Sequence, residues 1–335
     1  MAENGLIWPL LLVVLASGLD RLLGDPKRCY HPVMAMGAAI ALLRIWAEAW
    51  AGENTWRLRL AGFAITALLV GGSLAAGWGI ERLAIWQPAT SPLLIIGMAS
   101  TLAGRSLAVA TGDVLAALGQ QPENLPLARK QLSWLVGRDT AGLDSSEILR
   151  ATAETASENA VDGVFAPLFW LLLGAVLWCA GFMGAPGPLA LAWGFKASST
   201  LDSMLGYRTG KLRWLGTAGA RLDDLLVWLP CRLVALSLGQ LRAALRDGKP
   251  DPSPNAGVSQ AAYAHRLGIK MGGANHYEGV EIIKPLLNKN GREVQAADIV
   301  EILRLNKIIA LQWLIIVITF IIIITILVSA FIRGK

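Results

Sequence analysis

The stretch that decides the fold class is IIALQWLIIVITFIIIITILVSAFI, residues 308–332, which holds 25 residues without a charge between Lys307 and Arg333. A helix of that length rises about 37 Å. The hydrocarbon core of a bilayer is about 30 Å thick. This stretch therefore predicts a transmembrane helix.

The composition of the whole chain points the same way. Of its 335 residues, 54% are hydrophobic and only 16% are charged, whereas soluble domains carry about 25% charged residues. The apolar fraction is too high for a disordered chain, and Gly and Pro are too sparse for a fibrous one. A multi-pass membrane protein is the class that remains.

Five further apolar segments are expected to span the membrane: residues 6–19, 60–80, 83–104, 163–183 and 189–205. Glu81 and Arg82 predict the turn of a tight helical hairpin. Lys196 lies inside the last segment, so that arm is either shallow or faces a polar cavity. In residues 33–50, Arg44 and Glu48 lie four apart, which favours an interfacial amphipathic helix over a span. The expected fold is all-α, with about six transmembrane helices.

The basic residues predict the orientation of these spans. Loops 20–59, 105–162 and 206–307 then share one side of the membrane and carry 26 of the 30 Lys and Arg residues. Cytoplasmic loops are the ones enriched in Lys and Arg. We therefore expect one membrane-embedded domain over residues 1–335 in a bacterial inner membrane, with polar helical loops in the cytoplasm.

The net charge of +6 also has a location. Residues 196–307 hold 16 basic and 10 acidic side chains, which accounts for the whole excess. A local excess beside apolar spans gives no reason to expect nucleic acid as a partner. Cys29, Cys179 and Cys231 lack the spacing of a zinc site or a disulfide framework, and we interpret them as buried free thiols.

An acidic pattern precedes the fourth apolar segment. Asp144 and Glu147 form a capping box. Along the helix that follows, Glu154, Glu158 and Asp162 recur at every fourth position. The pattern fits either a solvated helix face or a cluster of hard oxygen ligands for Mg²⁺ carrying phosphates.

Other polar segments carry weaker signals. Residues 206–211 depart from a phosphate-binding loop in glycine spacing and in Leu212, so we reject that motif. Arg221 and Asp224 lie three apart, which suits a structural ion pair as well as catalysis. Residues 250–257 and 272–279 have the Pro and Gly content of simple turns.

Six of these segments, taken in order, resemble the adenosylcobinamide-phosphate synthase family of cobalamin biosynthesis, also called CbiB or CobD. They are DRLLGDPKRCYHPVMAMG (20–37), ETASENAVDGVFAPLFW (154–170), KASSTLDSMLGYR (196–208), ARLDDLLVWLPCRL (220–233), SPNAGVSQAAYA (253–264) and GGANHYEG (272–279). The resemblance covers residues 20 to about 305. It implies an inner-membrane ligase that joins adenosylcobyric acid, a cobalt corrinoid, to (R)-1-amino-2-propanol O-phosphate with ATP and Mg²⁺.

Roles for the polar residues follow from this resemblance as hypotheses. The catalytic candidates are Glu158, Asp162, Lys196, Asp202 and Asp224, with Asp162 and Asp202 as the Mg²⁺ ligands. The substrate- and phosphate-binding candidates are Asn159, Thr200, Ser203, Tyr207, Arg208, Arg221, Asn255, Gly272, Gly273, Asn275 and Tyr277. Asp25, His31, Glu154 and Asp223 are further candidates.

The expected partners are the lipid bilayer, the two substrates and other late cobalamin-pathway membrane enzymes. Two other classes of function stay open. A transporter for an anionic metabolite would also place polar groups at broken helices, and a scaffold of a corrinoid-assembly complex would bind without turnover.

Overall fold

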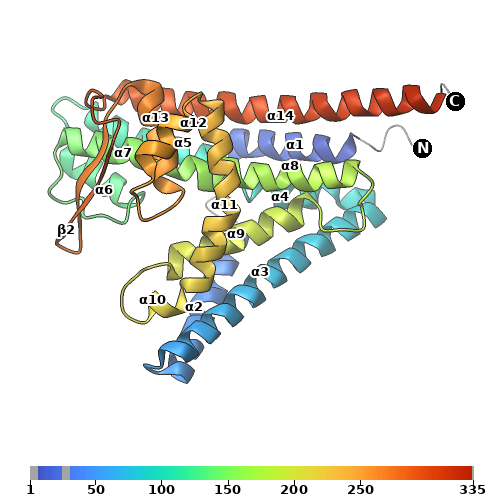
Figure 1. Cartoon of the computed structure of the whole chain (residues 1–335), viewed down its shortest axis with the longest axis horizontal. Helices are drawn as coiled ribbons and strands as arrows, with labels where there is room; N and C mark the ends of the chain where they lie inside the picture. The colour runs from blue at the N-terminus through green and yellow to red at the C-terminus, as the bar shows by residue number, and fades with distance from the viewer. Residues whose placement is uncertain (1–6, 25–30, 334–335) are drawn as a thin grey trace. The chain divides into compact units, whose positions relative to one another are not determined.

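The computed structural model describes residues 7–24 and 31–333, with side chains described up to residue 328. The chain forms two compact units. Unit 1 comprises Met1–Ala103, Ala166–Leu226 and Leu311–Lys335, and unit 2 comprises Gly104–Phe165 and Val227–Ala310. The fold is dominated by α-helices, as the sequence predicts (Figure 1).

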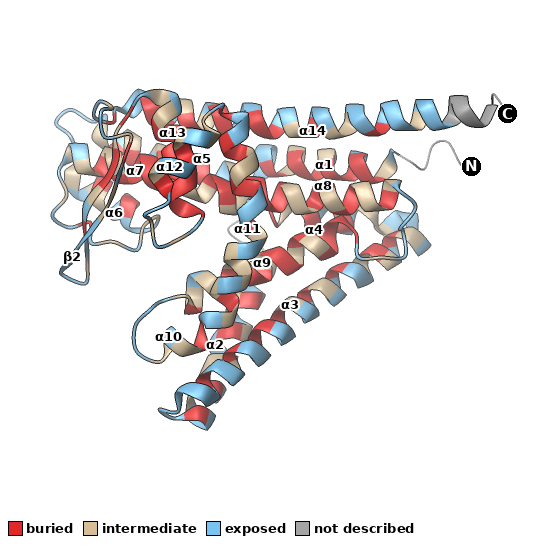
Figure 2. Ribbon diagram, viewed as in Figure 1, coloured by how far each residue is buried: buried red, intermediate tan, exposed pale blue. Residues whose placement is uncertain are grey.

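Unit 1 is built from apolar helices. They are α1 (Trp8–Leu23), α2 (Pro32–Ala51), α3 (Thr55–Trp86), the short η1 (Pro88–Thr90), α4 (Ser91–Ala99), α8 (Ala166–Cys179), α9 (Pro188–Leu205), α10 (Leu212–Leu215) and the first part of α11 (Thr217–Ser237). The core of this unit lies where α2, α3, α9 and α10 meet. Ile40, Ile65, Leu201 and Leu215 pack there, and Figure 2 shows the buried stripes along α3 and α9.

Five helical segments of the described chain are long and apolar enough to cross a membrane. They are Pro32–Ala51, Thr55–Trp86, Pro88–Leu118, Ser145–Cys179 and Ala296–Val328. The last lies in α14 (Ala296–Arg333) and contains most of the charge-free stretch 308–332. The protein is therefore a multi-pass membrane protein.

Three details of the predicted spans are corrected. Helix α2 is long and apolar enough to be a candidate span, and its Arg44 Nε and Glu48 Oε1 atoms lie 2.6 Å apart. Helices α1 and α9 do not qualify. Helix α1 has only 16 residues, and α9 contains Lys196 and Asp202 among its 18 residues.

The hairpin turn predicted at Glu81 and Arg82 is also wrong, because α3 continues to Trp86 and the turn falls at η1. Glu81 instead caps the start of α9. Its carboxylate accepts hydrogen bonds from the backbone N–H of Gly187, at 2.8 Å, and of Ala190, at 3.0 Å. A carboxylate at a helix N-terminus satisfies donors that have no partner in the helix itself.

Unit 2 contains the polar helices and a small hairpin. Its elements are α5 (Gly104–Leu118), α6 (Leu125–Ser133), α7 (Ser145–Ala160), the π-helical turn η2 (Val161–Phe165), the end of α11, α12 (Leu241–Gly248), α13 (Ala256–Leu267), β1 (Met271–Tyr277), β2 (Val280–Leu287) and the start of α14. Val114, Leu132 and Ile148 form an apolar core between α5, α6 and α7. The antiparallel hairpin adds a small sheet to the all-α prediction, in the segment expected to be a simple turn.

Candidate functional site

The acidic pattern of α7 is not a solvated face. The Glu154 side chain is only 2% exposed. Its Oε2 atom lies 2.5 Å from Arg138 Nη2, and its Oε1 atom lies 3.2 Å from Arg150 Nη1. The backbone N–H of Gly272 also donates to Oε1 at 2.8 Å. Glu154 is thus fully occupied in joining α7 to β1, which is a structural role.

Asn275 extends this cluster along β1. Its Oδ1 atom accepts hydrogen bonds from Arg138 at 2.6 Å and from Arg150 at 3.3 Å. The residue is only 3% exposed, and its Nδ2 atom has no hydrogen-bond partner in the described part of the chain. Buried amides rarely lack a partner. Asn275 therefore offers a donor that a substrate oxygen could use.

One turn further along α7, Glu158 meets different neighbours. Its Oε2 atom accepts a hydrogen bond from Gln260 Nε2 of α13 at 2.6 Å. Lys284 of β2 acts on it electrostatically, yet no ion pair within 4.0 Å joins the two among the described residues. Burial alone lowers the pKa of Lys284, but the charges of Glu158, Tyr277 and Asp251 raise it above the ordinary value. Lys284 therefore stays a cation facing an acid.

Asp162 lies in η2, the π-helical turn between α7 and α8. Such turns are rare and occur often at functional sites. Asp162 and Glu158 both act electrostatically on Cys231 of α11, and burial raises the pKa of that thiol to about 12. Cys231 is thus the buried free thiol that the sequence predicts. Asn159 donates to Thr155 Oγ1 at 3.1 Å within α7.

Asn255 is held at the start of α13 by α11. Arg232 donates to Asn255 Oδ1 at 2.5 Å and to the carbonyl oxygen of Pro254 at 2.7 Å. The Cys231 thiol donates to the Asn255 carbonyl at 3.3 Å. These contacts fix the proline-rich turn beside the acidic residues.

The hairpin depends on two glycines of the predicted site. Gly272 and Gly273 have φ values of +85° and +97°, at the point where the strand register shifts. A Cβ atom on Gly272 would lie 2.0 Å from the carbonyl oxygen of Pro285. Glycine is therefore required at position 272. Further along β1, Asn275 accepts a hydrogen bond from Arg150, and Tyr277 acts electrostatically on Lys284.

Unit 1 holds the remaining candidates on α9 and α11. Thr200 Oγ1 donates to the Lys196 carbonyl at 2.7 Å, and Ser203 Oγ donates to the Thr200 carbonyl at 3.1 Å. Asp202 lies against Gly206, where a Cβ atom would come within 2.2 Å of Asp202 Oδ1. The two hydroxyls therefore bond to their own helix.

Asp224 lies on α11 together with Arg221. Burial raises the pKa of its carboxyl, and the charges of Arg221 and Arg208 oppose that shift. The three groups therefore lie near one another, with Asp223 beside them on α11 and Tyr207 exposed before α10. Asp25 lies outside the described residues. His31 caps α2, because its Nδ1 atom accepts from the Val33 N–H at 3.3 Å.

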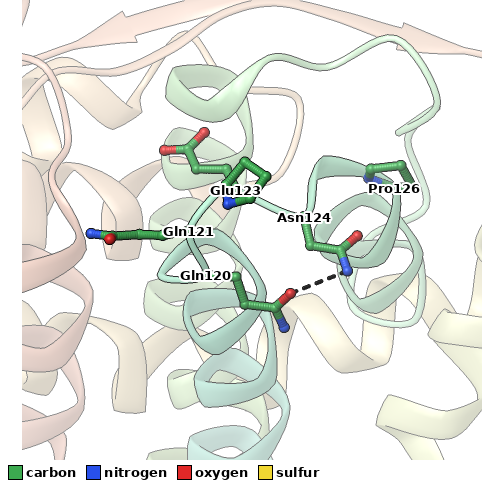
Figure 3. A pocket seen from close by; sticks show the side chains of 6 residues that line it. Gln120, Gln121, Glu123, Asn124 and Pro126 are labelled. Carbon is green, nitrogen blue, oxygen red and sulfur yellow. Dashed lines mark hydrogen bonds between the residues drawn. The ribbon is translucent and has the colours of Figure 1, made fainter.

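Within the described residues, no three or more His, Cys, Asp or Glu side chains come together as a metal site would require. Mg²⁺ usually enters such sites on substrate phosphates and takes one or two protein carboxylates. The acids of the described residues suit Mg²⁺ that arrives bound to substrate phosphates, and they do not form an all-protein metal site. A surface hollow of about 510 Å³ between α5 and α6, lined by Gln120, Gln121, Pro122, Glu123, Asn124 and Pro126, contains none of the predicted residues (Figure 3).

Four residues of the unit 2 cluster were missed by the sequence analysis as site residues: Arg138, Arg150, Gln260 and Lys284. Gln260 lies inside the quoted segment 253–264, which is the one signal that could have found it. The other three are ordinary basic residues in polar segments. Arg150 lies on α7 itself, Arg138 precedes that helix, and Lys284 comes from the hairpin.

The apolar helices and the buried polar cluster define a polytopic membrane protein with a polar helical unit. The sequence pattern of the CobD/Cbib protein family matches residues 13–306, so the chain belongs to this family. It is 41% identical to the cobalamin biosynthesis protein CobD of Synechocystis, over 95% of this chain and 94% of that protein. It is 38% identical to the CbiB protein of Salmonella typhimurium over 87% of this chain and 91% of the relative.

A CobD protein of Yersinia enterocolitica is 39% identical over 84% of this chain and 88% of its own length. No solved structure matches the chain.

Proposed function

We propose that the protein acts in cobalamin biosynthesis as an ATP-dependent ligase. It joins the carboxylate of adenosylcobyric acid to the amine of (R)-1-amino-2-propanol O-phosphate. The family and the names of its relatives support the pathway. The observation that carries the reaction is the half-buried Glu158 carboxylate, which Gln260 holds at 2.6 Å and on which Lys284 acts electrostatically without an ion pair within 4.0 Å.

An acid and a cation that are not ion-paired with each other can each contact one end of a substrate that carries both charges. The amine substrate has an ammonium group at one end and a phosphate at the other. In the proposed complex, Glu158 accepts a hydrogen bond from the ammonium, and Lys284 contacts the phosphate. Gln260 keeps the Glu158 carboxylate in position through its 2.6 Å hydrogen bond.

The chemistry requires an activated acid. ATP supplies the phosphoryl group that converts the corrinoid carboxylate into an acyl phosphate. Glu158 removes a proton from the ammonium, the free amine attacks the acyl carbon, and inorganic phosphate leaves. The Nδ2 donor of Asn275 would stabilise an oxygen that gains charge during this attack.

Asp162 is the proposed carboxylate for Mg²⁺ on the nucleotide, and the helical turn η2 sets its position. The resemblance implies contacts to Mg²⁺ and to phosphate groups for four further residues, and the proposal keeps them: Asp202, Lys196, Arg208 and Arg221. In the proposed orientation, the polar loops face the cytoplasm of a bacterial inner membrane, where ATP is available.

The test is turnover by the full-length protein in detergent or nanodiscs, with both substrates and ATP-Mg²⁺. Corrinoid amide and ADP should appear in equal amounts, measured by mass spectrometry. Glu158→Gln and Lys284→Met should each lower kcat/KM at least about 100-fold. Glu281→Gln, which changes an exposed glutamate on the same hairpin, is the matched control and should keep full activity.

The outcomes separate the classes of function. Substrate binding without product would favour a carrier or scaffold over a ligase. Normal activity in Glu158→Gln would reject the assignment of this carboxylate while leaving the ligase reaction in place.

A further inference from the structure

A second polar feature lies in unit 1 and contains none of the residues given a catalytic role. The guanidinium carbons of Arg59 and Arg213 lie 4.6 and 5.1 Å from the centre of the Trp214 ring. Arg59 belongs to the second turn of α3, and Arg213 and Trp214 belong to α10, which packs on α3. Arg57 lies over the neighbouring Trp50 at 5.7 Å.

The positive charges of these three arginines are not balanced by ion pairs with described acidic residues. In the described part of the chain, Arg57, Arg59 and Arg213 have no ion-pair partner. The nearby Glu53 is engaged by Lys211, whose Nζ atom lies 3.0 Å from Oε1. An indole face attracts a single cation, but two cations on one ring repel each other. An anion that contacts both guanidinium groups would remove this repulsion.

The chemistry of the pair selects the anion. Guanidinium forks match the oxygens of a phosphate with two parallel hydrogen bonds. The surroundings indicate that the phosphate belongs to a lipid, because Arg57 and Arg59 lie at the start of the candidate span Thr55–Trp86. Trp46, Trp50 and Trp56 are exposed around them, and exposed Trp side chains mark the headgroup level of a membrane.

The opposite end of α3 supports this position. Trp78 and Trp86 are exposed there. Trp78 follows Trp56 by 22 positions, a helical rise of about 33 Å that is close to the thickness of the hydrocarbon core. Arg82 is the basic residue at that end. It lies over Trp78 and donates to the carbonyl of Met183, so its charge is already engaged.

We propose that Arg59, Arg213 and Trp214 form a binding site for the phosphate of an anionic glycerophospholipid. The lipid's acyl chains lie along α3, and Arg57 contributes a further positive charge. The site is independent of the proposed ligase reaction, since it uses none of that reaction's residues.

The test measures lipid binding to the full-length protein by native mass spectrometry, with phosphatidylglycerol and phosphatidylcholine as probes. The wild type should retain phosphatidylglycerol at least tenfold more tightly. Arg59→Gln and Arg213→Gln should each weaken its binding about fivefold, the typical contribution of one basic residue at an anionic surface. The double variant should lose the preference, and Arg59→Lys should keep part of it.

Arg44→Gln is the matched control, since it removes an arginine that already has Glu48 as partner. It should leave the preference unchanged. The proposal is overturned if the wild type does not prefer phosphatidylglycerol. It is also overturned if Arg213→Gln binds this lipid as tightly as the wild type. Arg213 is exposed, so this change should not affect folding. Displacement of the lipid by inorganic phosphate at about 10 mM, roughly ten-thousandfold above a Kd of about 1 μM, would indicate a soluble phosphate site and reject the lipid.

Discussion

The guanidinium of Arg138 and the carboxylate of Glu154 lie 2.5 Å apart, and these side chains are 8% and 2% exposed. Arg150 and the Gly272 N–H complete the shell around the same carboxylate. Helix α7, the segment before it and the hairpin are therefore joined through one buried acid. The stability of unit 2 should depend on it.

Glu154→Gln tests this dependence. The change leaves two largely buried guanidinium groups without their counter-charge, which typically costs about 3–5 kcal/mol. The apparent Tm in detergent should fall by roughly 10 °C. Glu301→Gln removes a surface partner of Arg304 at 2.9 Å, and such exposed pairs contribute about 1 kcal/mol or less. Equal Tm shifts in the two variants would show that the buried pair contributes no more than a surface pair.

The hairpin glycines offer a second stability test. Gly272→Ala adds both a strained φ and a Cβ atom 2.0 Å from the Pro285 carbonyl, whereas Gly273→Ala adds strain with Leu286 Cδ2 at 3.7 Å as the nearest atom. Backbone strain of this kind costs about 1–3 kcal/mol. Limited proteolysis should cut the hairpin of Gly272→Ala faster than that of Gly273→Ala. Equal cleavage rates would mean that strain, and not the close approach of β2, explains both glycines.

The sequence predicted the membrane class, the capping box at Asp144 and the common face of Glu154 and Glu158, because these depend on neighbouring residues. It could not predict what covers that face. Arg138 precedes Glu154 by 16 residues without helical spacing, and Gly272 follows it by 118. A polar helix face is easily interpreted as solvent-exposed from sequence alone, because the residues that bury it are distant in the chain.

The mistaken turn at Glu81 has a similar cause. Charged residues between two apolar runs are a reasonable sign of a membrane boundary. Glu81, however, satisfies the N–H groups at the start of α9, over a hundred residues later. A helix can keep an acidic side chain inside an apolar run when the end of another helix provides its hydrogen bonds.

Cys231 should be chemically inert in the folded protein. Burial raises the pKa of its thiol to about 12. The thiolate is the reactive form of cysteine, and almost none of it exists at pH 8. Because burial raises the pKa from 9.0, the folded protein favours the neutral thiol. The contribution of this group to the free energy of unfolding is therefore complete below about pH 9 and is lost as the pH rises toward 12. In a Cys29→Ser, Cys179→Ser background, maleimide should label the native protein at pH 8 at least about 100-fold more slowly than the denatured protein. Rapid native labelling would contradict the burial of α11.

Asp247 predicts how unit 2 responds to acid. Its pKa is lowered from 3.8 to about 2 by the hydrogen bond from Arg246, with further donation from His265 and the Asn288 N–H. A lowered pKa means that the carboxylate stabilises the fold above about pH 4, and that this contribution disappears as the pH falls toward 2. The apparent Tm of the wild type should therefore decline across that window. Asp247→Asn should start lower at pH 7 and decline less, while Glu301→Gln should follow the wild type. Parallel curves for wild type and Asp247→Asn would show that this aspartate does not link α12, α13 and β2 through its charge.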